Sequence, residues 1–391
     1  MILNDRIIHF INEHEKDDIH TLALQSKLYP DIDMQFAIRQ IKGRQIVKEK
    51  VPSWYANDRI LYPQHLSLEQ CSSEQTARFK ASLCKGKSMT DLTGGFGVDC
   101  SFLSASFEET SYVEQQEELA KIAVHNFKQL GLERIKVINS DAVEYLSSMP
   151  AVDMVYIDPA RRDNTGRKTV LIEDCTPNVL AIEDLLEEKA AQTMIKLSPM
   201  LDISLAVKSL RNVSDVYIIS VGNECKELLF IKKRQSSGTH YHCINITGSK
   251  TDSFTFDKEE EDNISLSYSS DLGKYLYEPN ASILKGGAYK SIARSFSLDK
   301  LHPSSHLYTS DTLHSNFPGR VFAIQTISSL NKKDIKLHLA DIKQANITTR
   351  NFPLSVQEIR KKTGLKDGGE VYIFATTLAD DRKVLLICRK V

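Results

Sequence analysis

The stretch Thr90–Cys100, "TDLTGGFGVDC", places three glycines between a short apolar run and an amphipathic segment. Glycines at such a junction let the backbone turn sharply and approach a ligand closely. The pattern predicts a strand, a glycine turn and a helix, which together form the beginning of an α/β fold. The residues around this turn that we interpret as ligand-binding are Asp91, Thr93, Gly94, Gly95 and Gly97.

Short apolar runs and amphipathic stretches alternate from residue 88 onward. The predicted strands are 88–92, 110–114, 135–139, 153–157, 193–197 and 216–221, with helices beginning near residues 98, 115, 142, 177 and 201. This alternation predicts parallel strands covered by helices on both faces. A further strand, 226–234, follows too soon for a crossover helix, so we expect it to pair antiparallel. The predicted fold class is α/β and Rossmann-like, with six parallel strands and one antiparallel strand.

The chain is long enough for several domains, since a domain averages roughly 150 residues. The predicted divisions are an N-terminal helical domain (1–87), the α/β domain (88–235), an irregular, ferredoxin-like connecting segment (236–319) and a small basic α+β domain (320–391). Within the connecting segment, Phe256–Asp262 is expected to be an exposed acidic turn or linker. In the last division, strand and helix patterns alternate as in a split βαβ unit.

Capping signals place the first helices. Asp33 precedes apolar residues at helical spacing and predicts a helix over 34–50. Two capping-box patterns, starting at Ser67 and at Ser72, predict that a later helix begins at one of these serines.

Composition fits a globular protein, with 41% apolar and 26% charged residues. No stretch reaches the ~18 consecutive apolar residues of a membrane span, and the N-terminus contains acids where a secretion signal would be apolar. The seven cysteines stand singly, as is typical of free thiols in a reducing compartment. The histidine-containing stretches 240–243 and 302–306 lack the spacing of a zinc site. We therefore expect a cytoplasmic protein with no membrane contact and no structural metal.

Charge is distributed unevenly along the chain. Residues 320–391 hold 14 Lys and Arg against 7 Asp and Glu, a net charge of +7, while the whole chain carries −1. A compact basic region on an otherwise acidic chain favours a polyanionic partner such as RNA. The alternative is a solvated surface that keeps the domain soluble.

Acids at the ends of the next strands extend the candidate site. Glu114 closes the second strand, at the distance at which an acid reaches a ribose hydroxyl pair. Asp141 follows the third strand, where it could accept from an adenine amino group while the N–H of Ala142 reaches a ring nitrogen. Asp141 could equally be the N-cap of the next helix.

Two nucleotide cofactors fit a glycine turn of this kind. A dinucleotide requires G-x-G-x-x-G/A, and the third position of that pattern falls on Cys100. Asp91 and Asp99 bracket the turn with negative charge, which suits the ammonium and sulfonium of S-adenosylmethionine better than a pyrophosphate. S-adenosylmethionine is therefore the expected cofactor, and a nicotinamide-dependent oxidoreductase is the less favoured alternative.

At these motifs the chain resembles the class I S-adenosylmethionine-dependent methyltransferases. The matching residues are "DLTGGFG" (91–97), Glu114, "SDA" (140–142) and "IDPA" (157–160), and the late antiparallel strand is that family's topological mark. More narrowly, the chain resembles a bacterial group with a C-terminal THUMP-like domain. The stretches that carry this likeness are 61–80, 91–99, 158–162, 222–229 and 368–377. It covers nearly the whole chain and implies that 88–235 binds S-adenosylmethionine.

In the resembled enzymes, the fourth strand ends beside the transferable methyl group in a D/N-P-P-aromatic motif. Asp158 and Pro159 match its start, which implies that they are the catalytic residues. A carboxylate or amide oxygen and a backbone carbonyl there accept the two N–H bonds of an exocyclic amine and aim its lone pair at the methyl group. The second proline and the aromatic residue are replaced by Ala160 and Arg161. The candidate substrate contacts are Arg161, Arg162 and Lys196, although the arginines could instead pair with neighbouring acids.

The leading hypothesis is a methyltransferase whose basic C-terminal domain holds RNA and whose target is a tRNA or rRNA base. A second hypothesis keeps the chemistry but takes a protein or a small molecule as substrate. A third is a non-catalytic RNA-binding protein.

Overall fold

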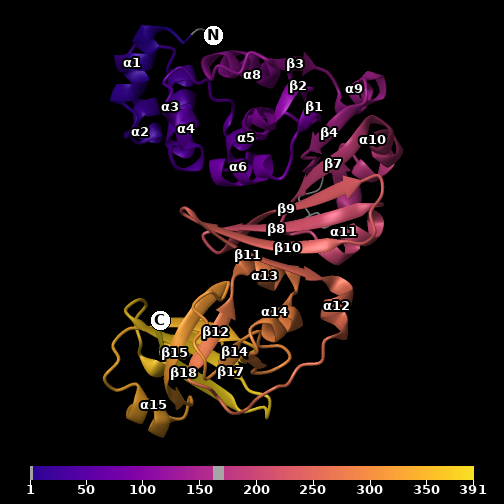
Figure 1. The fold of residues 1–391 in the computed structure, drawn as a ribbon. Coiled ribbons are helices and arrows are strands. Elements are labelled where there is room, and N and C mark those ends of the chain that lie inside the picture. Colours follow the sequence, from indigo (N-terminus) through magenta and orange to yellow (C-terminus); the bar gives the residue numbers. More distant parts are fainter. Residues whose placement is uncertain (1–2, 162–170) are drawn as a thin grey trace. The chain divides into compact units, whose positions relative to one another are not determined.

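The computed structural model describes residues 3–161 and 171–391, without the side chains of residues 65, 66 and 161. The chain forms two compact units (Figure 1). The first comprises Met1–Asp215 and Glu227–Gly238, and the second comprises Val216–Lys226 and Thr239–Val391. Among the described residues, no helix has both the length and the apolar character needed to cross a membrane.

Helices form the N-terminal part of the first unit, where Figure 1 shows them grouped in indigo and violet. They are α1 (Asp5–Glu13), α2 (Ile19–Leu24), η1 (Ser26–Leu28), α3 (Met34–Lys50), α4 (Pro52–Tyr55), α5 (His65–Gln70) and α6 (Glu74–Ser82). The predicted helix over 34–50 is confirmed, and the Asp33 carboxylate accepts the N–H of Phe36 at 3.0 Å.

The predicted capping boxes at Ser67 and Ser72 are wrong. The segment holds two helices, and the N-cap of the second is Ser73, whose hydroxyl accepts the N–H of Thr76 at 3.3 Å. Ser72 is buried, and its hydroxyl instead contacts charged side chains from other elements. A local pattern could not show this, because those partners are distant in sequence.

The sheet of the first unit has the strand order β9-β7-β4-β1-β2-β3. Its strands are β1 (Gly86–Asp91), β2 (Phe107–Glu114), β3 (Ile135–Asn139), β4 (Val152–Ile157), β7 (Ala190–Leu197) and β9 (Glu224–Lys233). The first five pair parallel, and β9 pairs antiparallel with β7, which confirms the expectation for 226–234. The sixth predicted strand is β8 (Val213–Val221), most of which belongs to the second unit.

The remaining elements of the first unit connect these strands. The helices are α7 (Val98–Leu103), η2 (Ser104–Ser106), α8 (Glu117–Gln129), α9 (Ala142–Ser148), η3 (Ile172–Asp174), η4 (Val179–Ile182), α10 (Glu183–Lys189) and α11 (Ile203–Ser209). Two short strands, β5 (Ala160–Arg161) and β6 (Cys175–Thr176), pair antiparallel.

The N-terminal helices pack directly against the glycine turn. Trp54 of α4 is buried and meets the ring of Phe96, inside "TGGFG", edge to face at 4.8 Å between centroids. Val47, Tyr62 and Leu68 belong to the same apolar cluster. Buried aromatic pairs of this geometry contribute about 0.5–1.5 kcal/mol beyond their burial. The helical segment therefore supports the turn on which the candidate site is built.

The second unit contains two sets of strands. In the first set, β8 pairs with β10 (His240–Thr247), and β10 pairs antiparallel with β11 (Lys250–Asp257). The second set is a seven-stranded sheet in the order β13-β14-β12-β15-β18-β17-β16. Its strands are β12 (Tyr275–Pro279), β13 (Asp299–Lys300), β14 (Tyr308–Ser310), β15 (Gly319–Ser328), β16 (Asn346–Arg350), β17 (Val371–Thr377) and β18 (Lys383–Lys390). The helices are α12 (Lys258–Asn263), α13 (Ala281–Gly286), α14 (Tyr289–Ser295), α15 (Lys332–His338) and α16 (Val356–Thr363).

The expectation of an exposed acidic turn at Phe256–Asp262 is wrong. This stretch contains the end of β11 and most of α12, and Glu261 is buried. Its carboxylate accepts the N–H groups of Lys290 and Ser291 at 2.8 and 2.7 Å, in the first turn of α14. Acids satisfy the free N–H groups at a helix start, so one member of the charge run has a structural role.

Candidate functional site

Three strand ends of the first unit bring the predicted residues together at one edge of the sheet. The glycine turn follows β1, Glu114 ends β2, and Asp158 follows β4, which pairs with β1 on its other side. The N–H of Gly95 donates to Oε2 of Glu114 at 2.9 Å. The N–H of Asp158 donates to Oγ1 of Thr93 at 2.6 Å. These contacts connect the turn to both neighbouring strands.

The turn needs glycine for two different reasons. Gly95 and Gly97 have φ of +54° and +89°, in the left-handed region that side chains disfavour. A Cβ at Gly94 would lie 2.2 Å from the ring of Tyr112, whose hydroxyl donates to the Gly95 carbonyl at 2.6 Å. A Cβ at Gly95 would meet only the Thr93 carbonyl, at 3.8 Å. The space above Gly95 is therefore open to a ligand.

The carboxylates at this edge are largely removed from water. Asp91 is 1% exposed and Glu114 is 8% exposed. Burial raises the pKa of Asp91 well above its ordinary value; Asp99 and Asp158 act in the same direction, and the N–H of Thr93, donated at 3.0 Å, opposes them. Buried acids that lack a full set of cationic partners create a region suited to a positively charged ligand.

Asp141 takes the structural position that its sequence context also allowed. Its Oδ1 accepts the N–H groups of Val143 and Glu144 at 2.8 and 3.1 Å, and so caps α9, which begins at Ala142. It stands at the end of β3, next to the strand that Glu114 ends. The capping bonds use one carboxylate oxygen, and a carboxylate has about four acceptor positions.

Asp158 lies at the corner that the sequence singled out, followed by the buried Pro159. Its side chain is 34% exposed, and its Oδ2 is 2.5 Å from Nζ of Lys196. Lys196 is near the end of β7, which pairs with β4 so that Ile157 lies opposite Ile195. Asp158 follows Ile157 and Lys196 follows Ile195, so the parallel register places the two charged residues side by side.

Sequence reasoning missed the charged cluster beneath this corner. Nζ of Lys80 on α6 is fully buried and lies 2.9 Å from both Asp99 Oδ1 and Glu227 Oε1. The Ser72 hydroxyl accepts from Lys80 at 2.7 Å and donates to Asp99 Oδ2 at 2.8 Å. Lys196 reaches the same hydroxyl at 3.3 Å and lies 3.6 Å from Asp99 Oδ2. We call Ser72, Lys80, Asp99, Lys196 and Glu227 the buried charge cluster.

The cluster sets the protonation of its members. Burial alone would raise the pKa of Asp99, but Lys80 and Lys196 outweigh it and hold that pKa well below its ordinary value. Burial would lower the pKa of Lys196, but the carboxylates of Asp158 and Asp99 raise it above its usual range. For Asp158, burial raises the pKa and Lys196 opposes the increase. Lys196 is therefore a fixed cation beside Asp158.

The arginines after Pro159 are only partly within the described residues. The backbone of Arg161 pairs with Cys175 in the β5–β6 ribbon, but its side chain is not described. Arg162 lies outside the described residues. Their proposed substrate contacts stay a prediction.

Comparison with known proteins agrees with these motifs. One similar solved structure comes from Porphyromonas gingivalis W83 and is described as a candidate methyltransferase. It is 32% identical, covers 100% of both chains and gives a TM-score of 0.89. Residues 275–318 match a ferredoxin-like domain family, and residues 319–390 match a THUMP domain-like family. A search of curated proteins gave no match.

Two further structures cover smaller parts of the chain. An rRNA methylase from Streptococcus thermophilus is 17% identical and covers 41% of this chain and 96% of its own, with a TM-score of 0.31. TrmK from M. capricolum, in complex with S-adenosylhomocysteine, is 12% identical and covers 57% and 83%, with a TM-score of 0.34. We draw no conclusion about this chain from similarities this low.

The fold and the full-length match define a methyltransferase-like protein of the class I type, as the motif resemblance predicted. The chain belongs to the same family as the Porphyromonas gingivalis protein, in which a methyltransferase-like fold is combined with a THUMP-like C-terminal domain.

Proposed function

We propose that this chain transfers a methyl group from S-adenosylmethionine to an exocyclic amine of a base in tRNA or rRNA. The observation that carries the proposal is the hydrogen bond from the N–H of Asp158 to Oγ1 of Thr93. It fixes the Asp-Pro corner beside the glycine turn, so a substrate held by the corner would lie next to a cofactor held by the turn.

The residues around the turn fit the cofactor chemically. Glu114 accepts hydrogen bonds from the ribose hydroxyls, and the backbone at Gly95 leaves open space for close approach. The acid Asp91 lies near the cationic methionine end, together with Thr93, Gly94 and Gly97. Asp141 and the N–H of Ala142 meet the adenine. When bound, the cofactor supplies an activated methyl group on a sulfonium.

The Asp-Pro corner positions the acceptor. Asp158 and the carbonyl of Pro159 accept the two N–H bonds of the amine, which orients the nitrogen lone pair toward the methyl carbon. The N–C bond forms as the C–S bond breaks, and the amine nitrogen gives up one proton to solvent. Holding the two reacting atoms in line is the main source of acceleration in such a reaction.

Lys196 acts through Asp158 in this proposal. Its Nζ lies 2.5 Å from the Asp158 carboxylate and in reach of Asp99, so its charge is directed at protein groups. Its charge opposes the rise in the pKa of Asp158 that burial causes, which favours the ionised, accepting form, and it limits the rotation of the carboxylate. We assign Lys196 as a positioning residue and no longer as a substrate contact.

The RNA assignment rests on charge and on the domain match. Residues 320–391 carry +7, and almost all of them match the THUMP domain-like family. Lysines and arginines that neutralise phosphates release counterions, so RNA affinity falls steeply as salt rises. Affinity for bulk tRNA and rRNA that does not depend on salt would contradict RNA as the substrate.

The direct test is transfer of a labelled methyl group from S-adenosylmethionine to RNA and, separately, to a protein extract. We expect incorporation into RNA, and loss of about 100-fold or more in Asp158→Ala, which removes the acceptor oxygen. Asp158→Ala should still bind the cofactor. Labelling of protein alone would favour the alternative substrate class, and thermal stabilisation by NAD instead of S-adenosylmethionine would favour an oxidoreductase.

A further inference from the structure

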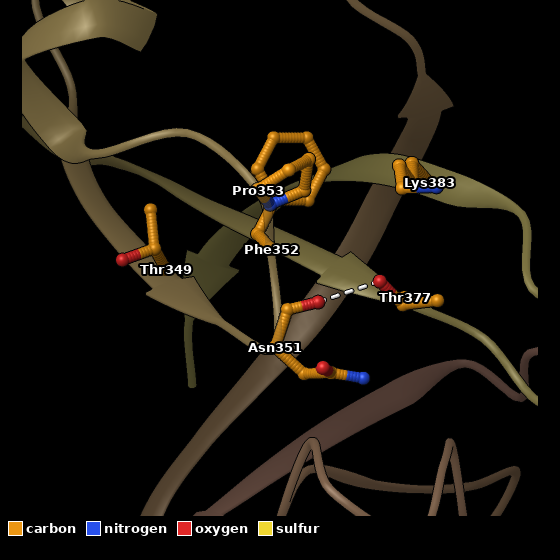
Figure 2. Close-up of a pocket in the computed structure, with 6 residues that line it drawn as sticks. All are labelled: Thr349, Asn351, Phe352, Pro353, Thr377 and Lys383. Atoms are coloured by element: carbon orange, nitrogen blue, oxygen red, sulfur yellow. Dashed lines mark hydrogen bonds between the residues drawn. The ribbon is translucent and has the colours of Figure 1, made fainter.

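A pocket of about 410 Å³ lies at the strand ends of the seven-stranded sheet of the second unit. The Asp-Pro corner belongs to the first unit. Its lining residues, drawn in Figure 2, are Thr349, Asn351, Phe352, Pro353, Thr377 and Lys383. They come from the carboxyl ends of β16 and β17 and from the first residue of β18. Strands β16 and β17 are parallel, and the carboxyl ends of parallel strands are where α/β sheets commonly bind ligands.

The walls of the pocket combine an aromatic ring with a cation. Phe352 is half-buried and packs against the apolar cluster beneath α16, which includes Ile347 and Ile359, so the ring is anchored from behind. Lys383 is exposed at the start of β18, directly opposite Thr377 in the antiparallel register. Anchored aromatic rings with nearby cations hold single-stranded nucleic acids, because the ring stacks on a base and the cation attracts a phosphate.

The floor of the pocket is held in a fixed conformation. Asn351 has φ of +52°, in the left-handed region, which disfavours most side chains by about 1–2 kcal/mol but asparagine less. The hydroxyl of Thr377 donates to the Asn351 carbonyl at 2.5 Å, the bond drawn in Figure 2. The Asn351 amide also lies 3.0 Å from Nδ1 of His302. The carbonyl and the side-chain amide of Asn351 thus each have a partner, and a residue that its surroundings hold in the left-handed region is typical of binding sites.

We propose that this pocket holds one nucleotide of a single-stranded segment of the RNA substrate, with the base on Phe352 and a phosphate at Lys383. The proposal rests on the proposed function, since it takes RNA as the substrate. Thr349, Asn351 and Thr377 supply the hydroxyl and amide groups around the nucleotide. The volume lies within the range of about 300–1,000 Å³ that is usual for small-ligand sites.

The test is fluorescence anisotropy of the full chain with a short labelled single-stranded oligoribonucleotide, across a salt series. We expect Phe352→Leu to weaken binding about tenfold, because it removes a stacking surface and keeps an apolar side chain. Lys383→Gln should lower the slope of log affinity against log salt by about 0.7, the loss of one phosphate contact on a single strand. Exposed Lys332 of α15, changed to Gln, is the matched control for charge.

A double-mutant cycle separates the pocket from the general basic surface. Phe352→Leu and Lys383→Gln should be non-additive, because both side chains hold the same nucleotide, whereas Phe352→Leu and Lys332→Gln should add. Unchanged binding by Phe352→Leu, or additivity of both pairs, would overturn the pocket assignment and leave the proposed function intact. Failure of the unaltered chain to bind RNA would overturn both.

A free nucleotide carries the same base and phosphate groups as RNA, so competition by AMP is a further test. AMP should compete with the oligonucleotide only weakly, because a single nucleotide lacks the neighbouring phosphate contacts. Full displacement by micromolar AMP would assign the pocket to a free nucleotide and overturn the RNA proposal. Thermal unfolding of each variant, unchanged within a few degrees, verifies that the fold is intact.

Discussion

Nζ of Lys196 lies 2.5 Å from Oδ2 of Asp158, at the ends of two adjacent parallel strands. Neither residue is fully exposed, so water weakens their attraction less than it would on an open surface. The pair connects the proposed catalytic corner to the buried charge cluster and, through Lys80 and Ser72, to the segment around α6. The electrostatics of the corner therefore depend on residues that would not touch a substrate.

Lys196→Met should slow methyl transfer by about tenfold to 100-fold and change its pH dependence. Burial already raises the pKa of Asp158, and Lys196 is the opposing cation. Removing it raises this pKa further, so the acidic limb of kcat/KM against pH moves to higher pH. A pH–rate profile of both proteins measures the shift.

Lys196→Arg is the conservative control, because it keeps the charge and should restore the position of the acidic limb. If Lys196 contacted substrate only, Lys196→Met would raise KM and leave the acidic limb where it was. That result would contradict the positioning role.

Lys80→Met should destabilise the first unit by about 3–5 kcal/mol, because it leaves the carboxylates of Asp99 and Glu227 buried beside an apolar side chain. Arg78→Met on the same helix is the control. Arg78 is 61% exposed and pairs with Glu74, so its loss should cost less than about 1 kcal/mol. Denaturant unfolding measures the free energy of unfolding of both variants. An equal loss in the two would show that the buried ion pairs of Lys80 contribute no more to stability than the exposed pair of Arg78.

The effect of Lys80→Met should also depend on pH. The pKa of Asp99 is held well below its unfolded value of about 4. Its contribution to stability is therefore present above that value and is lost as pH falls through the lower folded pKa. Protonation also lowers the cost of burying the two carboxylates that lose Lys80 in the variant. The stability difference between the two proteins should thus narrow below about pH 4.

Asp91→Asn should stabilise the ligand-free chain at neutral pH by about 1 kcal/mol and weaken cofactor binding about tenfold. The folded pKa of Asp91 lies well above the unfolded value. The contribution of Asp91 to stability is therefore present at low pH and is lost as pH rises through the folded pKa. Because Asn does not ionise, the variant does not lose stability in this way. Thermal unfolding with and without S-adenosylhomocysteine tests the stability and the binding. A ligand-free variant less stable than the unaltered chain would contradict the expected stabilisation.

Gly95→Ala should weaken cofactor binding about tenfold or more, since its Cβ would occupy the open space above the turn. Gly131→Ala is the matched control, because Gly131 also has a positive φ, +69°, and its Cβ would meet nothing within 4 Å. Both changes should cost about 1 kcal/mol of stability for the backbone conformation. Equal cofactor affinity in the two variants would place the ligand away from the turn.

Much of the fold follows from residue patterns that depend on near neighbours. The predicted strand 135–139 is found as β3 with the same bounds, and the short turn before β9 requires its antiparallel pairing. The glycine turn follows in the same way, because the left-handed backbone at Gly95 favours that residue type.

The buried charge cluster could not be predicted because it joins residues from distant segments. Ser72, Asp99, Lys196 and Glu227 come from different loops, helices and strands, and only the register of β4 and β7 brings Asp158 to Lys196. Ser72 resembled a helix cap and Glu261 resembled part of an exposed acidic run, because each pattern is local and the partners are not. Residues missed in this way are polar or charged and buried, and their burial becomes visible only in three dimensions.

In the proposed complex, the turn after β1 and the carboxylate of Glu114 together hold the adenosyl group. Isothermal titration of the full chain and of Glu114→Gln with S-adenosylhomocysteine tests this arrangement. We expect one binding site per chain and an affinity about tenfold or more lower in the variant, which loses a charged acceptor for the ribose hydroxyls. Absence of binding to the unaltered chain, or the same affinity in both proteins, would contradict it.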